Sequence, residues 1–178
     1  MEQGYSDEIA VGDPAILVPL LYEPNSKPSG DIAVIPQHRD AQAPIFRMIA
    51  EMEGFRLIDI CTDIEDFCDQ LTGCRGVVSS SLHAVVAAHG YKIPARFIKV
   101  SDNPLGDGFK LLDYLSSVGL DDDTPVICTG VDDIRRAADT VELPRHYPDI
   151  EKLLSSCPFI KPSIKPDWIA RASAHFRY

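Results

Sequence analysis

The chain has 178 residues, of which 45% are hydrophobic and 25% charged, as expected for one soluble domain with a real core and not for a disordered or membrane-embedded chain. Its net charge of −10 repels phosphate backbones and argues against nucleic acid as a partner. The acidic N-terminus is unlike a secretory signal, and no apolar run approaches the roughly 20 residues of a membrane span, so we expect a cytoplasmic protein.

The first part of the chain predicts strands that alternate with helices. Gly12-Asp13-Pro14 is a turn, and the apolar residues 15–21 after it fit either a short helix or an opening strand. Residues 31–36 are β-branched on both faces, which is typical of a strand covered on both sides. We then predict a helix over about 43–53, a strand over 55–60 and a helix that carries Ile64, Phe67, Cys68 and Leu71.

The segment from Arg75 to Tyr114 organises the rest. A short apolar run over 76–78 passes through three serines into a helix with Leu82, Val85, Val86 and His89 on one side. Ser81 is a good N-cap, which places His83 in the first turn beside amides that have no intrahelical partner. A turn of this kind predicts an anion site.

The charge distribution favours the same segment. Between Arg75 and Lys110 the chain carries five Lys or Arg against two acidic residues, a surplus of +3 in an otherwise acidic protein. This window is too small for a nucleic-acid surface and fits one small anion better.

The remaining elements complete an α/β pattern. We predict a strand over 94–100, a loop over 101–108, a weaker strand over 125–128, and helices over 109–118, 131–141, 147–155 and 167–176. Such alternation predicts a Rossmann-like parallel sheet with helices on both faces, in which ligands bind outside the carboxyl ends of the strands. We expect one such domain over 1–178, with a core at about 11–142 and a C-terminal helical extension at about 143–178.

The cysteines and acidic runs do not indicate a metal site. The five cysteines form no Cys-x-x-Cys pair, so we expect buried free thiols and no zinc. The run Asp121-Asp122-Asp123 is interpreted as a solvated loop.

Several motifs together resemble a known family. They are Ser79-Ser80-Ser81-Leu82-His83, Gly106-Asp107-Gly108-Phe109-Lys110 and Asp113-Tyr114, with Gly12-Asp13-Pro14-Ala15 and Ile35-Pro36 upstream. Over roughly residues 11–120 the chain is similar to the C-terminal half of the polysaccharide pyruvyl transferase family, in the branch that decorates exopolysaccharides such as succinoglycan.

The chain departs from the family pattern in three ways. Ser81 stands where the family often has Arg, and Pro36-Gln37 replaces a Pro-His pair, with His38 one place later. The family has two Rossmann-like halves in a glycosyltransferase-B-like arrangement, of which this chain resembles only the second.

The resemblance implies transfer of a pyruvyl group from phosphoenolpyruvate, as donor substrate and without another cofactor, to a sugar of an exopolysaccharide or its lipid-linked precursor. His83 is the implied catalytic residue. The implied substrate-binding residues are Ser79, Ser80, Ser81, Leu82, Gly106, Asp107, Gly108, Lys110 and His38.

Other interpretations remain open. The chain fits half of a nucleotide-sugar glycosyltransferase, or a non-catalytic donor-binding half that needs a partner chain or forms a homo-oligomer. His83 and Lys110 also fit purely structural or solvated roles, and we expect His89 to be a satisfied core histidine and Arg75 to be structural.

Overall fold

The computed structural model describes residues 10–102, 108–121 and 124–177. Its centre is one parallel sheet of five strands in the order β2-β1-β3-β4-β5. The strands are β1 (Ile32–Ile35), β2 (Phe55–Leu57), β3 (Gly76–Ser79), β4 (Ala95–Lys99) and β5 (Val126–Ile127). The predicted α/β fold with a Rossmann-like parallel sheet is therefore confirmed.

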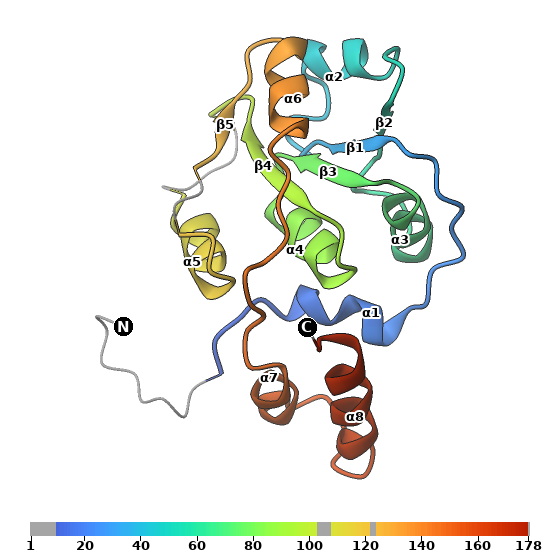
Figure 1. The fold of residues 1–178 in the computed structure, drawn as a ribbon, viewed down its shortest axis with the longest axis vertical. Coiled ribbons are helices and arrows are strands. Elements are labelled where there is room, and N and C mark those ends of the chain that lie inside the picture. Colours follow the sequence, from blue (N-terminus) through green and yellow to red (C-terminus); the bar gives the residue numbers. More distant parts are fainter. Residues whose placement is uncertain (1–9, 103–107, 122–123, 178) are drawn as a thin grey trace.

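Helices cover both faces of this sheet (Figure 1). On one face lie α2 (Pro44–Ile49) and α6 (Val131–Ala138), and on the other lie α3 (Ile64–Thr72), α4 (Leu82–Gly90) and α5 (Phe109–Ser117). A 3₁₀ helix, η1 (Pro14–Leu17), runs into α1 (Val18–Leu21) and packs on α4. The chain closes with α7 (Ile150–Ser156) and α8 (Lys165–His175).

The central strands are apolar on both sides. All four residues of β1 are buried, and they alternate between two cores: Ala33 and Ile35 face the α4 side, whereas Ile32 and Val34 face the α6 side. This alternation follows from the period of two in a strand. It explains why the sequence of β1 is a continuous apolar run.

The chain reverses its direction across the sheet at β2. It moves from β1 outward to β2, returns past β1 to β3, and then continues outward through β4 to β5. Right-handed crossovers put the helices before and after such a reversal on opposite faces, which leaves a crevice between the carboxyl ends of β1 and β3. This switch point is the expected ligand site of the fold.

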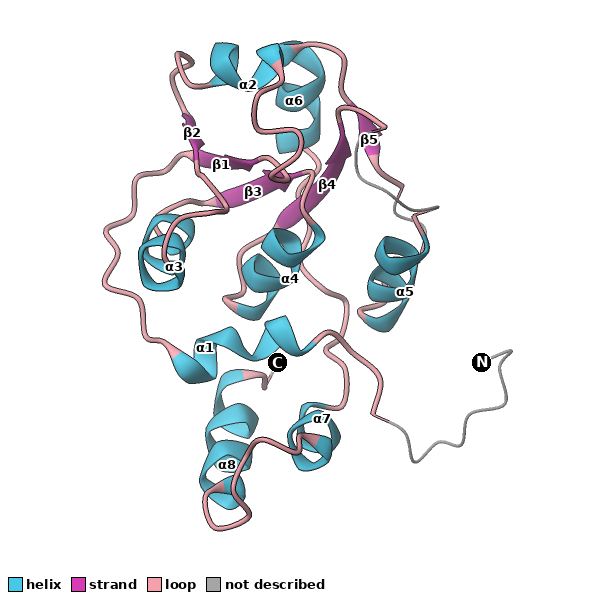
Figure 2. Cartoon of the chain, turned by 180° about the vertical axis from the view of Figure 1, so that it is seen from behind, coloured by secondary structure: helices cyan, strands magenta, loops and turns pink. Residues whose placement is uncertain are grey.

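The segment after α6 passes the start of β4 and the end of α4. Ala95 and Glu142 exchange two backbone hydrogen bonds of 2.9 and 3.2 Å, and the Tyr147 hydroxyl donates to the His89 carbonyl at 3.0 Å. Helices α7 and α8 then pack on each other below α1 (Figure 2). Within the described ranges, the structure contains no helix long and apolar enough to cross a bilayer.

Several predicted boundaries need correction. The apolar segment 15–21 is helical, and the helix predicted over 43–53 ends at Ile49, because Glu51 and Met52 bond three residues back in separate turns. The strand predicted over 55–60 ends at Leu57, where the Asp59 carboxylate accepts from the Cys61 amide and starts a turn. Of the five thiols, all free, Cys68, Cys74 and Cys128 are buried as predicted, but Cys61 is exposed and Cys157 half-buried.

Candidate functional site at the switch point

The loops that follow β1 and β3 are joined at the switch point. The Gln37 amide donates to the Ser80 hydroxyl at 2.9 Å, and the Ser80 amide donates to the Ile35 carbonyl at 3.2 Å. These bonds hold the segment that carries His38 beside the segment that leads to His83.

Two of the three serine hydroxyls are used inside the protein. The Ser79 hydroxyl donates to the Ile35 carbonyl at 2.7 Å and accepts from the Ser81 amide at 2.9 Å, while the Ser80 hydroxyl is taken by Gln37. Ser79, Ser80 and Ser81 are 0%, 4% and 6% exposed, so these residues shape the edge of the sheet. Their side chains are therefore less accessible to a ligand than expected for the substrate-binding residues that the family resemblance implies.

Helix α4 begins at this edge with open donors. Ser81 is its N-cap with an extended backbone, as predicted, but within the described part of the chain its hydroxyl makes no capping bond to the first turn. The first N–H groups of a helix have no intrahelical acceptor and carry a partial positive charge. As far as the described residues go, the amides of Leu82 and His83 are therefore candidate donors to an anion.

The His83 side chain stands at the surface opposite an acidic residue. Its side chain is 76% exposed, and its Nε2 lies 3.8 Å from Asp13 Oδ2. The other Asp13 oxygen accepts from the Ala15 amide at 2.9 Å, because Asp13 is the N-cap of η1 and Pro14 fills the first position. The hydrogen bond from Ala15 therefore holds the Asp13 carboxylate in place, with its second oxygen toward the His83 imidazole.

Asp13 is a residue that the sequence analysis missed as part of the site. The Gly-Asp-Pro turn was visible, but nothing in the sequence indicates that a carboxylate so far upstream reaches His83. The contact exists because η1 packs against α4.

The other predicted residues are placed as follows. His38 is exposed, and its Nδ1 lies 3.0 Å from the Gln37 side-chain amide. Gly108 is the left-handed N-cap of α5 with φ of 84°, and Lys110 is exposed in the first turn of that helix. Gly106 and Asp107 lie outside the described residues, and Leu82 is half-buried at the start of α4.

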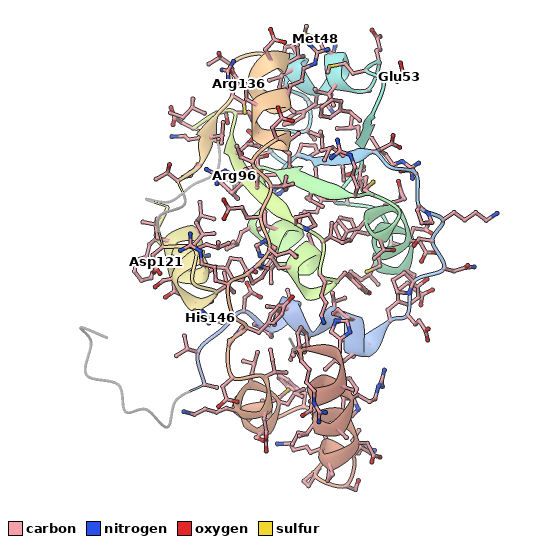
Figure 3. All side chains as sticks on the ribbon, viewed as in Figure 1. Met48, Glu53, Arg96, Asp121, Arg136 and His146 are labelled. Carbon is pink, nitrogen blue, oxygen red and sulfur yellow. The ribbon has the colours of Figure 1, made fainter. Side chains whose placement is uncertain are left out.

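The basic window does not form a patch. Arg75 precedes β3 and Lys92 follows α4, so both lie at the amino edge of the sheet, where Arg75 Nε donates to the Gly30 carbonyl at 2.9 Å. Arg96 lies along β4 and donates to the Thr124 carbonyl at 3.1 Å (Figure 3), and Lys99 pairs with Asp102 at 2.5 Å. The sequence surplus of +3 therefore does not converge on one anion.

A buried carboxylate connects two loops at the same edge. Asp40, after β1, is 2% exposed and accepts from the Ser101 hydroxyl, after β4, at 2.6 Å. The bond spans the end of β3, which lies between those strands. Sequence reasoning missed this residue because an acidic residue in a polar loop is usually solvated.

An apolar pocket of about 360 Å³ adjoins His83. It lies between the η1–α1 segment, the start of α3 and the start of α4. Among the described residues that line it, His83 has the one titratable side chain. The lining consists of Pro14, Ala15, Val18, Leu21, Ile60, Thr62, Ile64, Phe67, His83, Ala84 and Ala87.

His89, on the same helix, is a core histidine as predicted. It is 0% exposed, its Nε2 lies 3.2 Å from the Glu142 carbonyl, and its Nδ1 lies 2.7 Å from the Tyr114 hydroxyl. Because a carbonyl only accepts, Nε2 carries the proton and Nδ1 accepts from Tyr114. Burial lowers the pKa of His89 to about 4, so the ring is neutral.

Comparison with known proteins decides the family. The sequence profile described as polysaccharide pyruvyl transferase matches residues 5–102, which include β1, β3, the three serines and His83. The chain belongs to the polysaccharide pyruvyl transferase family.

One relative extends the comparison without adding a function. The chain is 32% identical over 120 residues to uncharacterized protein L143 of Acanthamoeba polyphaga mimivirus, a match that covers 65% of this chain. It spans 42% of the length of that relative. No solved structure matches this pyruvyl transferase family member.

Proposed function

We propose that this chain binds phosphoenolpyruvate at the β1/β3 switch point and contributes His83 to pyruvyl transfer onto a sugar. The observation that carries the proposal is the exposed imidazole at the start of α4, inside the segment that matches the family. In an open parallel sheet this is the edge where ligands bind. The finer assignment to the C-terminal half and to the exopolysaccharide branch is part of the proposal.

The chemistry determines what the site must supply. Two sugar hydroxyls add to C2 of the enol, a proton adds to the methylene carbon C3, and the C2–O bond to phosphate breaks. One hydroxyl proton replaces the proton given to C3, and the other leaves with phosphate, so the products are a pyruvate ketal and hydrogen phosphate with no change in oxidation state. The reaction needs an acid for C3 and donors for two anionic groups.

The residues divide these tasks as follows. His83 protonates the methylene carbon, and Asp13, 3.8 Å from its Nε2, positions the imidazole. The amides of Leu82 and His83 bind one anionic group of the donor, and Lys110 and His38 neutralise the other. Ser79, Ser80 and Ser81 hold the backbone in the required shape, and the family resemblance adds Gly106, Asp107 and Gly108 to the donor site.

Thermal protection tests donor binding. Phosphoenolpyruvate should raise the unfolding temperature of the wild type, and His83→Gln should remove that shift, whereas nucleotides and nucleotide sugars should have no effect. His146→Gln is the matched control, because His146 is exposed in the segment between α6 and α7 (Figure 3). Protection by a nucleotide sugar instead would support a glycosyltransferase half and contradict the proposal.

Proton uptake gives a second test. An anionic donor beside His83 favours the imidazolium, so donor binding should take up a proton. Calorimetry in buffers of different ionisation enthalpy should then give wild-type binding heats that change with the buffer, and any heat that remains in His83→Gln should not change with the buffer. A wild-type binding heat that does not change with the buffer would contradict the acid role of His83.

A donor-binding half that needs a partner chain is a second candidate. It is favoured by one fact: the chain spans 42% of the relative that it matches. Under this alternative the isolated chain binds phosphoenolpyruvate but releases no phosphate with any sugar. Phosphate release by the isolated chain in the presence of an acceptor would exclude it.

A further inference from the structure

The proposed donor contacts leave the pocket beside His83 unused. It measures about 360 Å³, which is within the range of small-ligand pockets. Its buried lining comes from Phe67, Ala84 and Ala87, and Leu21 and Ile64 line it while remaining 67% and 63% exposed. It is therefore hollow, apolar and open to solvent.

The chemistry of the lining restricts its occupant. A phosphate or carboxylate placed there would lose its hydration against aliphatic side chains, which disfavours the donor. A sugar ring would bury several hydroxyls against a lining whose described polar side chains are Thr62 and His83. The pocket suits a small apolar group, and its lining includes His83, so such a group would lie beside the proposed reaction site.

We propose that this pocket binds the apolar aglycone of the acceptor, an alkyl or aryl group joined to the anomeric carbon of the sugar. The inference rests on the proposed function, because it takes His83 to be the place where donor and acceptor meet. The sugar hydroxyls stay at the solvated edge near His83, and the aglycone extends between α1 and α3. Acceptor selection then depends on the group attached to the sugar as well as on the sugar itself.

A homologous series measures this directly. The probes are n-alkyl β-D-glucopyranosides from methyl to hexyl, titrated into the full chain without phosphoenolpyruvate. Each methylene that enters the pocket should tighten binding roughly fourfold. The NMR signals of the His83 ring, assigned by comparison with His83→Gln, should shift on titration, while those of His146 stay constant.

Two exposed lining residues test the location. Leu21→Gln and Ile64→Gln should flatten the increase in affinity with chain length and leave the unfolding temperature unchanged, since both side chains are largely exposed. Met48→Gln and Leu112→Gln are matched controls, 55% and 51% exposed and absent from the pocket lining. Met48 lies on α2, at the end of the molecule opposite α7 and α8 (Figure 3).

Specific results would overturn the proposal. These are affinities that do not depend on chain length, an increase that survives in Leu21→Gln and Ile64→Gln, or an increase lost equally in the controls. A dimer in sedimentation that dissociates in the two pocket variants would also overturn it, because the pocket would then be covered by a second copy.

A negative result in this experiment can be distinguished from a failure of the proposed function. No donor is present, so a flat series leaves phosphoenolpyruvate protection and its loss in His83→Gln unaffected. Conversely, a steep series in a protein that phosphoenolpyruvate does not protect would contradict the proposed donor site and leave the apolar pocket confirmed as a glycoside site.

Discussion

Helix α4 carries two histidines with opposite environments. His83 lies in the first turn with its side chain 76% exposed opposite Asp13, whereas His89 lies near the end of the helix and is 0% exposed between Tyr114 and Glu142. The sequence presents both as imidazoles on one helix. Their positions relative to the sheet edge make one accessible to ligands and the other part of the core.

The comparison separates function from stability within a few residues. An exposed side chain beside open helix amides contributes little to folding, so changes at His83 should affect binding and catalysis. A buried, fully hydrogen-bonded ring contributes through packing and its two bonds, so changes at His89 should affect the free energy of unfolding. Substitutions at each histidine therefore test one side of this contrast.

The largest effect is expected from His83→Gln on pyruvyl transfer. Loss of the proposed general acid should lower the turnover rate by about 10²–10⁴-fold. Phosphate release measures the rate, and urea denaturation should show an unchanged free energy of unfolding. Wild-type turnover in this variant would remove His83 from the mechanism.

His89→Ala should instead destabilise the protein by about 3–5 kcal/mol, as for a large buried ring replaced by a methyl group. The Tyr114 hydroxyl and the Glu142 carbonyl also lose their partner. The midpoint of urea unfolding measures the change, and His146→Ala is the exposed control. A change below about 1 kcal/mol would show that the ring is not part of the core.

The pH dependence of stability should also identify His89. Its pKa is about 4 in the folded protein against an ordinary 6.5, because burial disfavours the charged ring. The unfolded chain therefore binds the proton first, and stability present above pH 6.5 is lost as the pH falls toward 4. The loss from this group should be about 3 kcal/mol between pH 7 and pH 4. Comparison with His89→Gln over this range isolates it, and identical slopes in the two proteins would contradict the assignment.

Tyr114→Phe should have a smaller effect. It removes the hydroxyl that donates to His89 Nδ1 at 2.7 Å and leaves that buried acceptor without this bond, which costs about 1–3 kcal/mol. The His89→Gln background provides the double-mutant cycle. Additive losses in that cycle would indicate that the two side chains are not coupled.

The smallest effect is expected at Lys92, just after the end of α4. Lys92 has a left-handed backbone with φ of 59°, a conformation that favours glycine. Lys92→Gly should raise the free energy of unfolding by up to about 1 kcal/mol, and Lys92→Val should lower it. Thermal unfolding measures both variants, and equal effects of the two substitutions would rule out backbone strain at this position.

The sequence by itself determined the alternating α/β pattern, the Ser-to-His turn after β3 and the core role of His89. These depend on local periodicity and on spacing along one helix, which a sequence contains. The predicted end points of α2 and β2 were less accurate, because short turns such as the one at Asp59 compete with the regular elements.

Only the tertiary structure decided which distant residues meet. It brought Asp13 to His83, joined Asp40 to Ser101, separated Arg75 and Lys92 from the candidate site, and formed the apolar pocket between α1, α3 and α4. The physical reason is that strand order and helix packing fix these distances. The charge surplus of the segment from Arg75 to Lys110 was a property of the sequence, but its division between the two edges of the sheet is a property of the fold.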